Sequence, residues 1–111
     1  MVKKYKVIIT PEARDSLRKQ MDRVRRRIND QVAKRIRAEI ISVIESLETF
    51  PESKERVEEI NFGHIEYRKA LDHKYGYKII YTIDDDRVEV LVVEIIYGAE
   101  DPQTLIDKFK P

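Results

Sequence analysis

The chain has 111 residues, of which 41% are hydrophobic and 39% charged, and its formal net charge is +1. This length suits a single domain, expected over residues 1–111, with one modest core and a densely ionic surface. The absence of cysteine excludes disulfides and thiolate metal sites, and two histidines are too few for a histidine-rich metal centre. We therefore expect neither a metal nor a cofactor.

A membrane protein is not expected either. No apolar run approaches the roughly 20 residues that a membrane-spanning helix needs. The N-terminal residues lead directly into a strand-like segment and lack the pattern of a signal peptide. These features predict a cytoplasmic protein without membrane contact.

Charge is distributed unevenly along the chain. Residues 1–37 contain thirteen Lys or Arg and four Asp or Glu, a net charge of +9, whereas residues 38–111 carry −8. Such a chain could present a basic face to nucleic acid or to an acidic partner. Alternatively, the two halves neutralise each other once folded.

The first elements expected are a strand and a helix. Residues 5–10 form a short β-branched run that ends at Pro11, which indicates an opening strand. Thr10 suits the N-cap of a following helix, Pro11 its first position and Glu12 its first turn. Apolar residues then recur every three or four positions, at Ala13, Leu17, Met21, Val24 and Ile28.

The same apolar stripe continues into a second helix. Asn29 and Asp30 offer a break and a fresh N-cap, so the pattern favours a hairpin of two antiparallel helices over one very long helix. The second helix must end before Pro51, because the residue preceding a proline is pushed out of the helical region. Its apolar positions are Val32, Ile36, Ile40, Val43, Ile44 and Leu47.

Three strands are expected in the remaining chain. Residues 51–63 form a polar connection with room for one helical turn, and it closes at Gly63. Strands are then predicted over residues 64–71, 75–83 and 87–96, the last nearly all apolar and hence central. Residues 98–102 break the chain, and residues 103–109 predict a short C-terminal helix.

These elements define an α+β domain with the order β-αα-βββ. It consists of an opening strand, a two-helix antiparallel hairpin, a three-strand antiparallel meander in one small sheet, and a short C-terminal helix. The hairpin should cover one face of the antiparallel sheet. The uncovered face is then the place to look for function.

Standard catalytic motifs are missing from the sequence. It has no glycine-rich phosphate loop, no paired metal-ligand spacing and no serine or cysteine nucleophile beside a base. The run Asp84-Asp85-Asp86 indicates a solvated turn, because three consecutive carboxylates cannot all face one ion.

Glu94 stands out within the apolar strand that ends the expected sheet. It shares strand parity with Val90 and Val92, and Arg68 and Lys78 on neighbouring strands could meet its charge. A general base would need a raised pKa and a substrate proton within reach. We therefore favour a paired structural carboxylate over a catalytic one.

Arg68, Lys78 and Tyr97 allow two interpretations. Together they could grip a phosphate and stack on a base. Alternatively, the two basic residues pair with Glu66 and Glu94, and Tyr97 packs on the rim. The tyrosines at 75, 77 and 81 alternate with Ile79 and Ile83, which favours core positions for them.

A second candidate site is a basic cluster around the turn of the helical hairpin. Such clusters contact nucleic acid or an acidic protein patch, although many are only solvated helix surfaces. Its members are Arg23, Arg25, Arg26, Arg27, Lys34, Arg35 and Arg37.

Three segments together resemble the RelE/ParE superfamily of bacterial and archaeal toxins. "YKVIITPEARDSL" is similar to the family's opening strand and first helix, and "IISVIESLETFP" to the end of its second helix. "YRKAL…YGYKIIYTIDDDRVEVLVVEIIYGAEDP" is similar to its three-strand core and the exit from it. Their order and spacing cover almost the whole chain.

The resemblance implies the toxin of a type II toxin–antitoxin system that stabilises a plasmid or chromosome. A cognate antitoxin would neutralise it by wrapping a segment around it, and operator DNA would be contacted only through that antitoxin. RelE-like members cleave mRNA on the ribosome with residues of the open sheet face. ParE-like members instead poison DNA gyrase.

Residue by residue, the resemblance favours the ParE-like branch. Arg68 matches a basic strand position, and Lys78 in "GYKIIY" takes the place of an arginine. RelE-like nucleases carry an arginine after the last strand, where Ala99 stands here. "YGAED" looks closer to the ParE-like ending "HGARD", with Tyr97 in the histidine's place.

Three functional hypotheses follow. The favoured one is a ParE-like toxin that acts on DNA gyrase without nuclease activity. The second is a ribosome-dependent mRNA endoribonuclease, with Arg68, Lys78, Glu94 and Tyr97 as its catalytic residues. The third is an inactive relic that only binds its partner.

Overall fold

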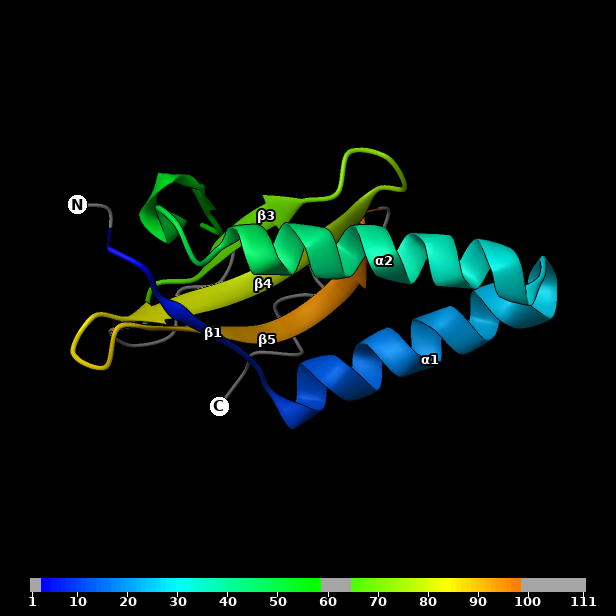
Figure 1. Cartoon of the computed structure of the whole chain (residues 1–111), viewed down its shortest axis with the longest axis horizontal. Coiled ribbons are helices and arrows are strands. Elements are labelled where there is room, and N and C mark those ends of the chain that lie inside the picture. The colour runs from blue at the N-terminus through cyan, green and yellow to red at the C-terminus, as the bar shows by residue number, and fades with distance from the viewer. Residues whose placement is uncertain (1–2, 59–64, 99–111) are drawn as a thin grey trace.

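A two-helix hairpin lies over one face of a mixed β-sheet (Figure 1). The computed structural model describes residues 3–58 and 65–98. Its elements are β1 (Lys6–Ile9), α1 (Pro11–Arg27), α2 (Asp30–Ser46), the 3-10 helix η1 (Pro51–Ser53), β2 (Glu55–Arg56), β3 (Arg68–Leu71), β4 (Tyr77–Asp84) and β5 (Glu89–Tyr97). The α+β class is confirmed, and the β-αα-βββ order holds except for one further short strand, β2, before the last three.

The sheet differs from the expected antiparallel one at both edges. Its strand order is β1-β5-β4-β3-β2, and β1 pairs in parallel with β5, from Lys6 opposite Glu89 to Ile9 opposite Val92. The predicted three-strand antiparallel meander is confirmed as β3, β4 and β5, whereas β1 adds a parallel edge to the expected antiparallel sheet, because the hairpin between β1 and the meander acts as a crossover connection. The two-residue strand β2 was missed because its residues are both charged.

Element boundaries are close to those expected. β3 begins at Arg68 rather than 64, β4 at Tyr77 rather than 75, and β5 runs over Glu89–Tyr97 rather than 87–96. β5 is an internal strand, as its apolar sequence predicts. The predicted turn at Gly63 and the predicted helix over 103–109 lie outside the described residues.

Both helices begin at the predicted caps. The Thr10 hydroxyl accepts a hydrogen bond from the Ala13 amide at 3.3 Å, and Pro11 occupies the first helical position. The Asn29 side chain accepts from the Val32 amide at 2.8 Å and starts α2. Because α1 ends at Arg27 and the Asn29 cap begins a separate helix at Asp30, the chain folds as a hairpin of two helices.

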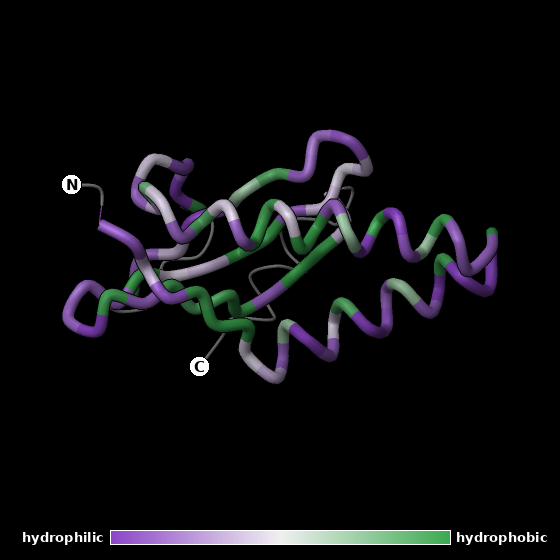
Figure 2. The backbone as a smooth tube through the Cα atoms, viewed as in Figure 1, coloured by the Kyte–Doolittle hydropathy of each residue, from purple (hydrophilic) through white to green (hydrophobic). Residues whose placement is uncertain are grey.

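Apolar residues fill both faces of the sheet. The larger core cluster lies between the sheet and the helices, and it includes Leu17, Ile40 and Ile79. Figure 2 shows the basis of this layering, since β5 is largely hydrophobic whereas both helices alternate between hydrophilic and hydrophobic residues. On the opposite face, Ile80 and Ile96 are only 0% and 2% exposed. The expected open face is therefore not a bare polar surface.

The tyrosines of β4 occupy the core, as their alternation predicts. Tyr77 and Tyr81 are buried with Ile79 in the larger cluster. The Tyr81 hydroxyl donates a hydrogen bond of 2.5 Å to the Pro51 carbonyl and so fastens η1 to the sheet. A buried phenol needs such a partner.

We predict that Thr10→Ala lowers the free energy of unfolding by about 1–2 kcal/mol, because it removes an N-cap and a hydroxyl bonded to β5. Urea unfolding followed by circular dichroism measures the change. Thr10→Ser keeps the hydroxyl and should recover most of the loss. Equal losses in both variants would contradict the capping role.

Alkaline pH should destabilise the fold through Tyr81. Burial raises the pKa of this phenol above its ordinary value of 10.0. Above pH of about 10 the unfolded chain loses the proton while the folded chain keeps it, so stability falls as pH rises. Tyr81→Phe should lose less stability between pH of about 9 and 11 than the parent does, by up to about 1.4 kcal/mol per pH unit. The free energy of unfolding is measured by urea titration at each pH. An equally steep fall with pH in both proteins would contradict this prediction.

Candidate functional site

Glu94 completes the edge of β5 where β1 no longer covers it. β1 ends at Ile9, opposite Val92, and α1 then runs beside the remainder of β5. The Glu94 carboxylate accepts hydrogen bonds from the Ser16 hydroxyl and, at 3.0 Å, from the Ile95 amide. The Gln20 side chain donates to the Ile95 carbonyl at 2.5 Å. Side chains of α1 and Glu94 itself therefore serve backbone groups that a neighbouring strand would otherwise serve.

A β-bulge places Glu94 on a different face from the one its parity indicates. Tyr81 lies opposite Val92, but Ile80 lies opposite Glu94, so Val93 is an extra residue on β5. Side chains of consecutive β4 residues point to opposite faces. The strand parity that Glu94 shares with Val92 therefore does not give the two side chains a common face, because the bulge reverses the alternation.

The expected charged set of Arg68, Lys78 and Glu94 is not assembled. Arg68 lies opposite Tyr81 on the helix side of the sheet, whereas Lys78 lies opposite Ile96 on the other side. Glu94 shares its row with Ile80 and Lys69. The prediction failed for Arg68 because sequence alone gave no register between β3 and β4.

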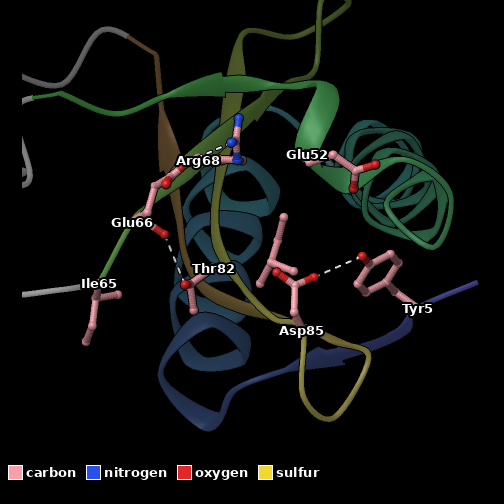
Figure 3. Close-up of a pocket in the computed structure, with 8 residues that line it drawn as sticks. Tyr5, Glu52, Ile65, Glu66, Arg68, Thr82 and Asp85 are labelled. Carbon is pink, nitrogen blue, oxygen red and sulfur yellow. Dashed lines mark hydrogen bonds and ion pairs between the residues drawn. The ribbon is translucent and has the colours of Figure 1, made fainter.

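Arg68 instead lines a pocket beside η1 (Figure 3). Its guanidinium is 2.6 Å from the Glu66 carboxylate and donates a 2.5 Å hydrogen bond to the Lys54 carbonyl. The side chain is only 20% exposed. The interpretation in which Arg68 pairs with Glu66 is thus the one that the structure displays.

The surroundings of this pocket are acidic. Its volume is about 410 Å³, and the carboxylates of Glu52, Glu66 and Asp85 lie around the single arginine. The Tyr5 hydroxyl donates to Asp85 at 3.1 Å, and this contact together with burial raises the pKa of Tyr5. Three carboxylates beside one neutralised guanidinium make a poor site for a phosphate.

Tyr97 and Lys78 lie at the opposite end of β4 and β5, where the register places them on opposite faces of the sheet. The rings of Tyr97 and Tyr77 make an edge-to-face contact with centroids 5.4 Å apart. Burial raises the pKa of Tyr77, and the nearby Arg23 guanidinium acts in the opposite direction. Tyr97 lies opposite Tyr77, and Arg68 lies opposite Tyr81, four residues further along β4. The two positions are therefore about 13 Å apart along the strand direction.

The chain leaves β5 through a constrained glycine. The Gly98 amide donates to the Gly76 carbonyl at 2.6 Å, and a Cβ atom on Gly98 would lie 2.5 Å from that oxygen. Gly76 itself has φ of +85°. The "YG" of the exit is therefore a close backbone contact that only glycine permits.

Asp72 supports this contact and was not predicted. It is buried, and its carboxylate accepts from the Lys74 and Tyr75 amides at 3.0 and 3.2 Å. An aspartate four residues before Gly76, at the start of a turn, is the sequence signal that could have indicated it.

The predicted basic cluster forms the hairpin tip, which we define as residues 23–37. Figure 1 shows this end of the hairpin projecting beyond the sheet. All seven basic side chains are exposed. Arg25 pairs with Asp22 and Asp30, and Lys34 pairs with Asp30. Within the described parts of the chain, Arg23, Arg26, Arg27, Arg35 and Arg37 form no ion pair.

Residues 3–58 and 65–98 contain neither a metal-binding group nor a membrane-spanning helix. No group of three His, Asp or Glu side chains in these ranges is placed to hold a metal ion. No helix there is both long and apolar enough to cross a membrane.

A helical hairpin on a five-stranded sheet of this order is the fold of a RelE/ParE superfamily toxin. The family described as "ParE toxin of type II toxin-antitoxin system, parDE" matches residues 7–102, and the chain belongs to it.

A solved structure supports the fold. It is the crystal structure of the toxin–antitoxin complex RelBE2 from Mycobacterium tuberculosis, in which one chain is 18% identical to this one. The superposition has a TM-score of 0.56 and covers 90% of this chain and 97% of the RelBE2 chain. No curated protein matches this chain by sequence.

We predict that Glu94→Ala lowers the free energy of unfolding by about 1–3 kcal/mol, because the Ile95 amide and the Ser16 hydroxyl lose their acceptor. Glu94→Gln keeps an acceptor oxygen and should be closer to the parent. Urea unfolding measures both, and growth inhibition in cells is followed alongside. If Glu94→Gln unfolds like the parent but no longer inhibits growth, the carboxylate acts on a substrate and the structural assignment fails.

Proposed function

We propose that this ParE-family toxin inhibits growth by acting on DNA gyrase, and that it does not cleave mRNA. The observation that carries this proposal is the dispersal of the four candidate nuclease side chains. Arg68 is paired in an acidic pocket and Glu94 is bonded at the edge of β5, while Lys78 and Tyr97 share only the end of the sheet where β5 exits.

Dispersal weakens the nuclease hypothesis for a chemical reason. Cleavage of an RNA backbone without a metal needs a base, an acid and a cation within reach of one phosphate. Arg68 and the exit of β5 are about 13 Å apart along the sheet and project to different surroundings. A single phosphate therefore cannot contact both.

The proposal includes a protein partner and a cellular place. The fold neighbour RelBE2 was solved as a toxin–antitoxin complex, which supports a cognate antitoxin that wraps around this chain. We place the toxin in the cytoplasm, where gyrase acts, as part of a system that stabilises a plasmid or chromosome.

A growth experiment separates the two mechanisms. The chain is expressed without its antitoxin, and plasmid supercoiling and transcript integrity are followed together. We expect supercoiling to fall while ribosome-associated transcripts stay intact. Transcript cleavage with unchanged supercoiling would overturn the proposal in favour of the endoribonuclease, and no growth defect would point to a relic.

Variants at the exit of β5 sharpen this experiment. Lys78→Ala and Tyr97→Phe remove the two candidate nuclease groups whose side chains form no hydrogen bond or ion pair within the described structure. Both variants should keep growth inhibition and gyrase inhibition to within about twofold, because neither group performs chemistry in this mechanism. Loss of toxicity with an unchanged melting temperature would favour the nuclease hypothesis.

A further inference from the structure

The hairpin tip concentrates positive charge that the fold does not use. Residues 23–37 contain seven Lys or Arg and one Asp, a net charge of +6, whereas the chain as a whole carries +1. Arg25 and Lys34 account for the tip's ion pairs. The other five arginines are exposed and keep their charge and their N–H donors available.

We propose that the hairpin tip binds the phosphate backbone of duplex DNA, independently of base sequence. The inference rests on the proposed function for the source of the DNA, which is the segment held by gyrase.

The shape of the molecule makes the tip accessible to a long, rigid partner. The tip projects beyond the sheet (Figure 1), and its basic side chains are exposed. Arg26 and Arg27 end α1, and Arg35 and Arg37 lie in the first two turns of α2, so both helices contribute cations. Arg23 and Arg27 are one turn apart and lie on the same side of α1.

The chemistry of the tip favours a duplex over an acidic protein. Duplex DNA carries about one negative charge per 1.7 Å of its axis, and guanidinium groups bind phosphates in pairs of hydrogen bonds. Protein interfaces are instead built around buried apolar or aromatic anchors. The tip offers one exposed large hydrophobic side chain, Ile28, which is 62% exposed.

Direct binding tests the proposal. The purified full-length chain is titrated into a labelled mixed-sequence duplex of about 20 base pairs, by fluorescence anisotropy, over a range of salt concentrations. The triple variant Arg26→Ala/Arg27→Ala/Arg35→Ala should bind at least about tenfold more weakly than the parent, and the slope of log K against log salt should fall by about 2 to 3.

Two matched variants control this measurement. Lys6→Ala/Arg14→Ala/Lys54→Ala removes the same charge from exposed positions outside the tip and should bind almost as the parent does. The triple Arg→Lys variant at 26, 27 and 35 keeps the charge and should stay within a few-fold of the parent. Circular dichroism and melting temperature confirm that each variant is folded.

Several results would overturn the proposal. They are no duplex binding by the parent, equal weakening in both charge-removal variants, or tighter binding to single-stranded RNA of equal length. If the tip variant loses gyrase inhibition although the parent never binds DNA, the tip contacts protein instead. Gyrase inhibition that persists without DNA binding rejects this inference and leaves the proposed function standing. DNA binding by the tip without any effect on gyrase rejects the proposed function and leaves this inference standing.

Discussion

The contact between α1 and the edge of β5 is the constraint on which the rest of the structure depends. β1 covers only the first half of β5, and an uncovered sheet edge leaves backbone groups without partners. Thr10 begins to cover the second half, since its amide and hydroxyl both donate to the Val92 carbonyl. Further along β5, Gln20 donates to the Ile95 carbonyl, and Glu94 accepts from the Ile95 amide and from Ser16. Because these contacts fix where α1 lies, they also fix the direction in which the hairpin projects.

Sequence reasoning succeeded where the determining interactions are local. The caps at Thr10 and Asn29 and the alternation of the β4 tyrosines depend on neighbours within a few residues, and all were predicted. It failed where the structure depends on how segments distant in sequence pair with one another. The parallel pairing of β1, the bulge at Val93 and the face of Arg68 depend on register between strands, which no local pattern encodes. The structure separates the members of the predicted site, because that site combined residues across those registers.

The uneven charge of the sequence becomes a separation in space. The acidic pocket around Arg68 lies beside η1 and the turn after β4, whereas the arginine-rich tip projects from the other end of the hairpin. The two charged halves of the chain therefore do not simply neutralise each other. Arg68 is a basic residue used inside the fold, and the tip arginines other than Arg25 are basic residues that the fold leaves available.

This division also decides how losses of toxicity should be understood. Arg68 and Glu94 each hold backbone or charged partners, so replacing either changes stability together with any function. Such variants cannot by themselves identify a catalytic group, because unfolding lowers the amount of active toxin. Apart from Arg25, the tip arginines lack ion pairs within the described structure, and Tyr97 is exposed at the end of its strand. A loss of toxicity at those positions, in a protein of unchanged stability, identifies the surface that meets the target.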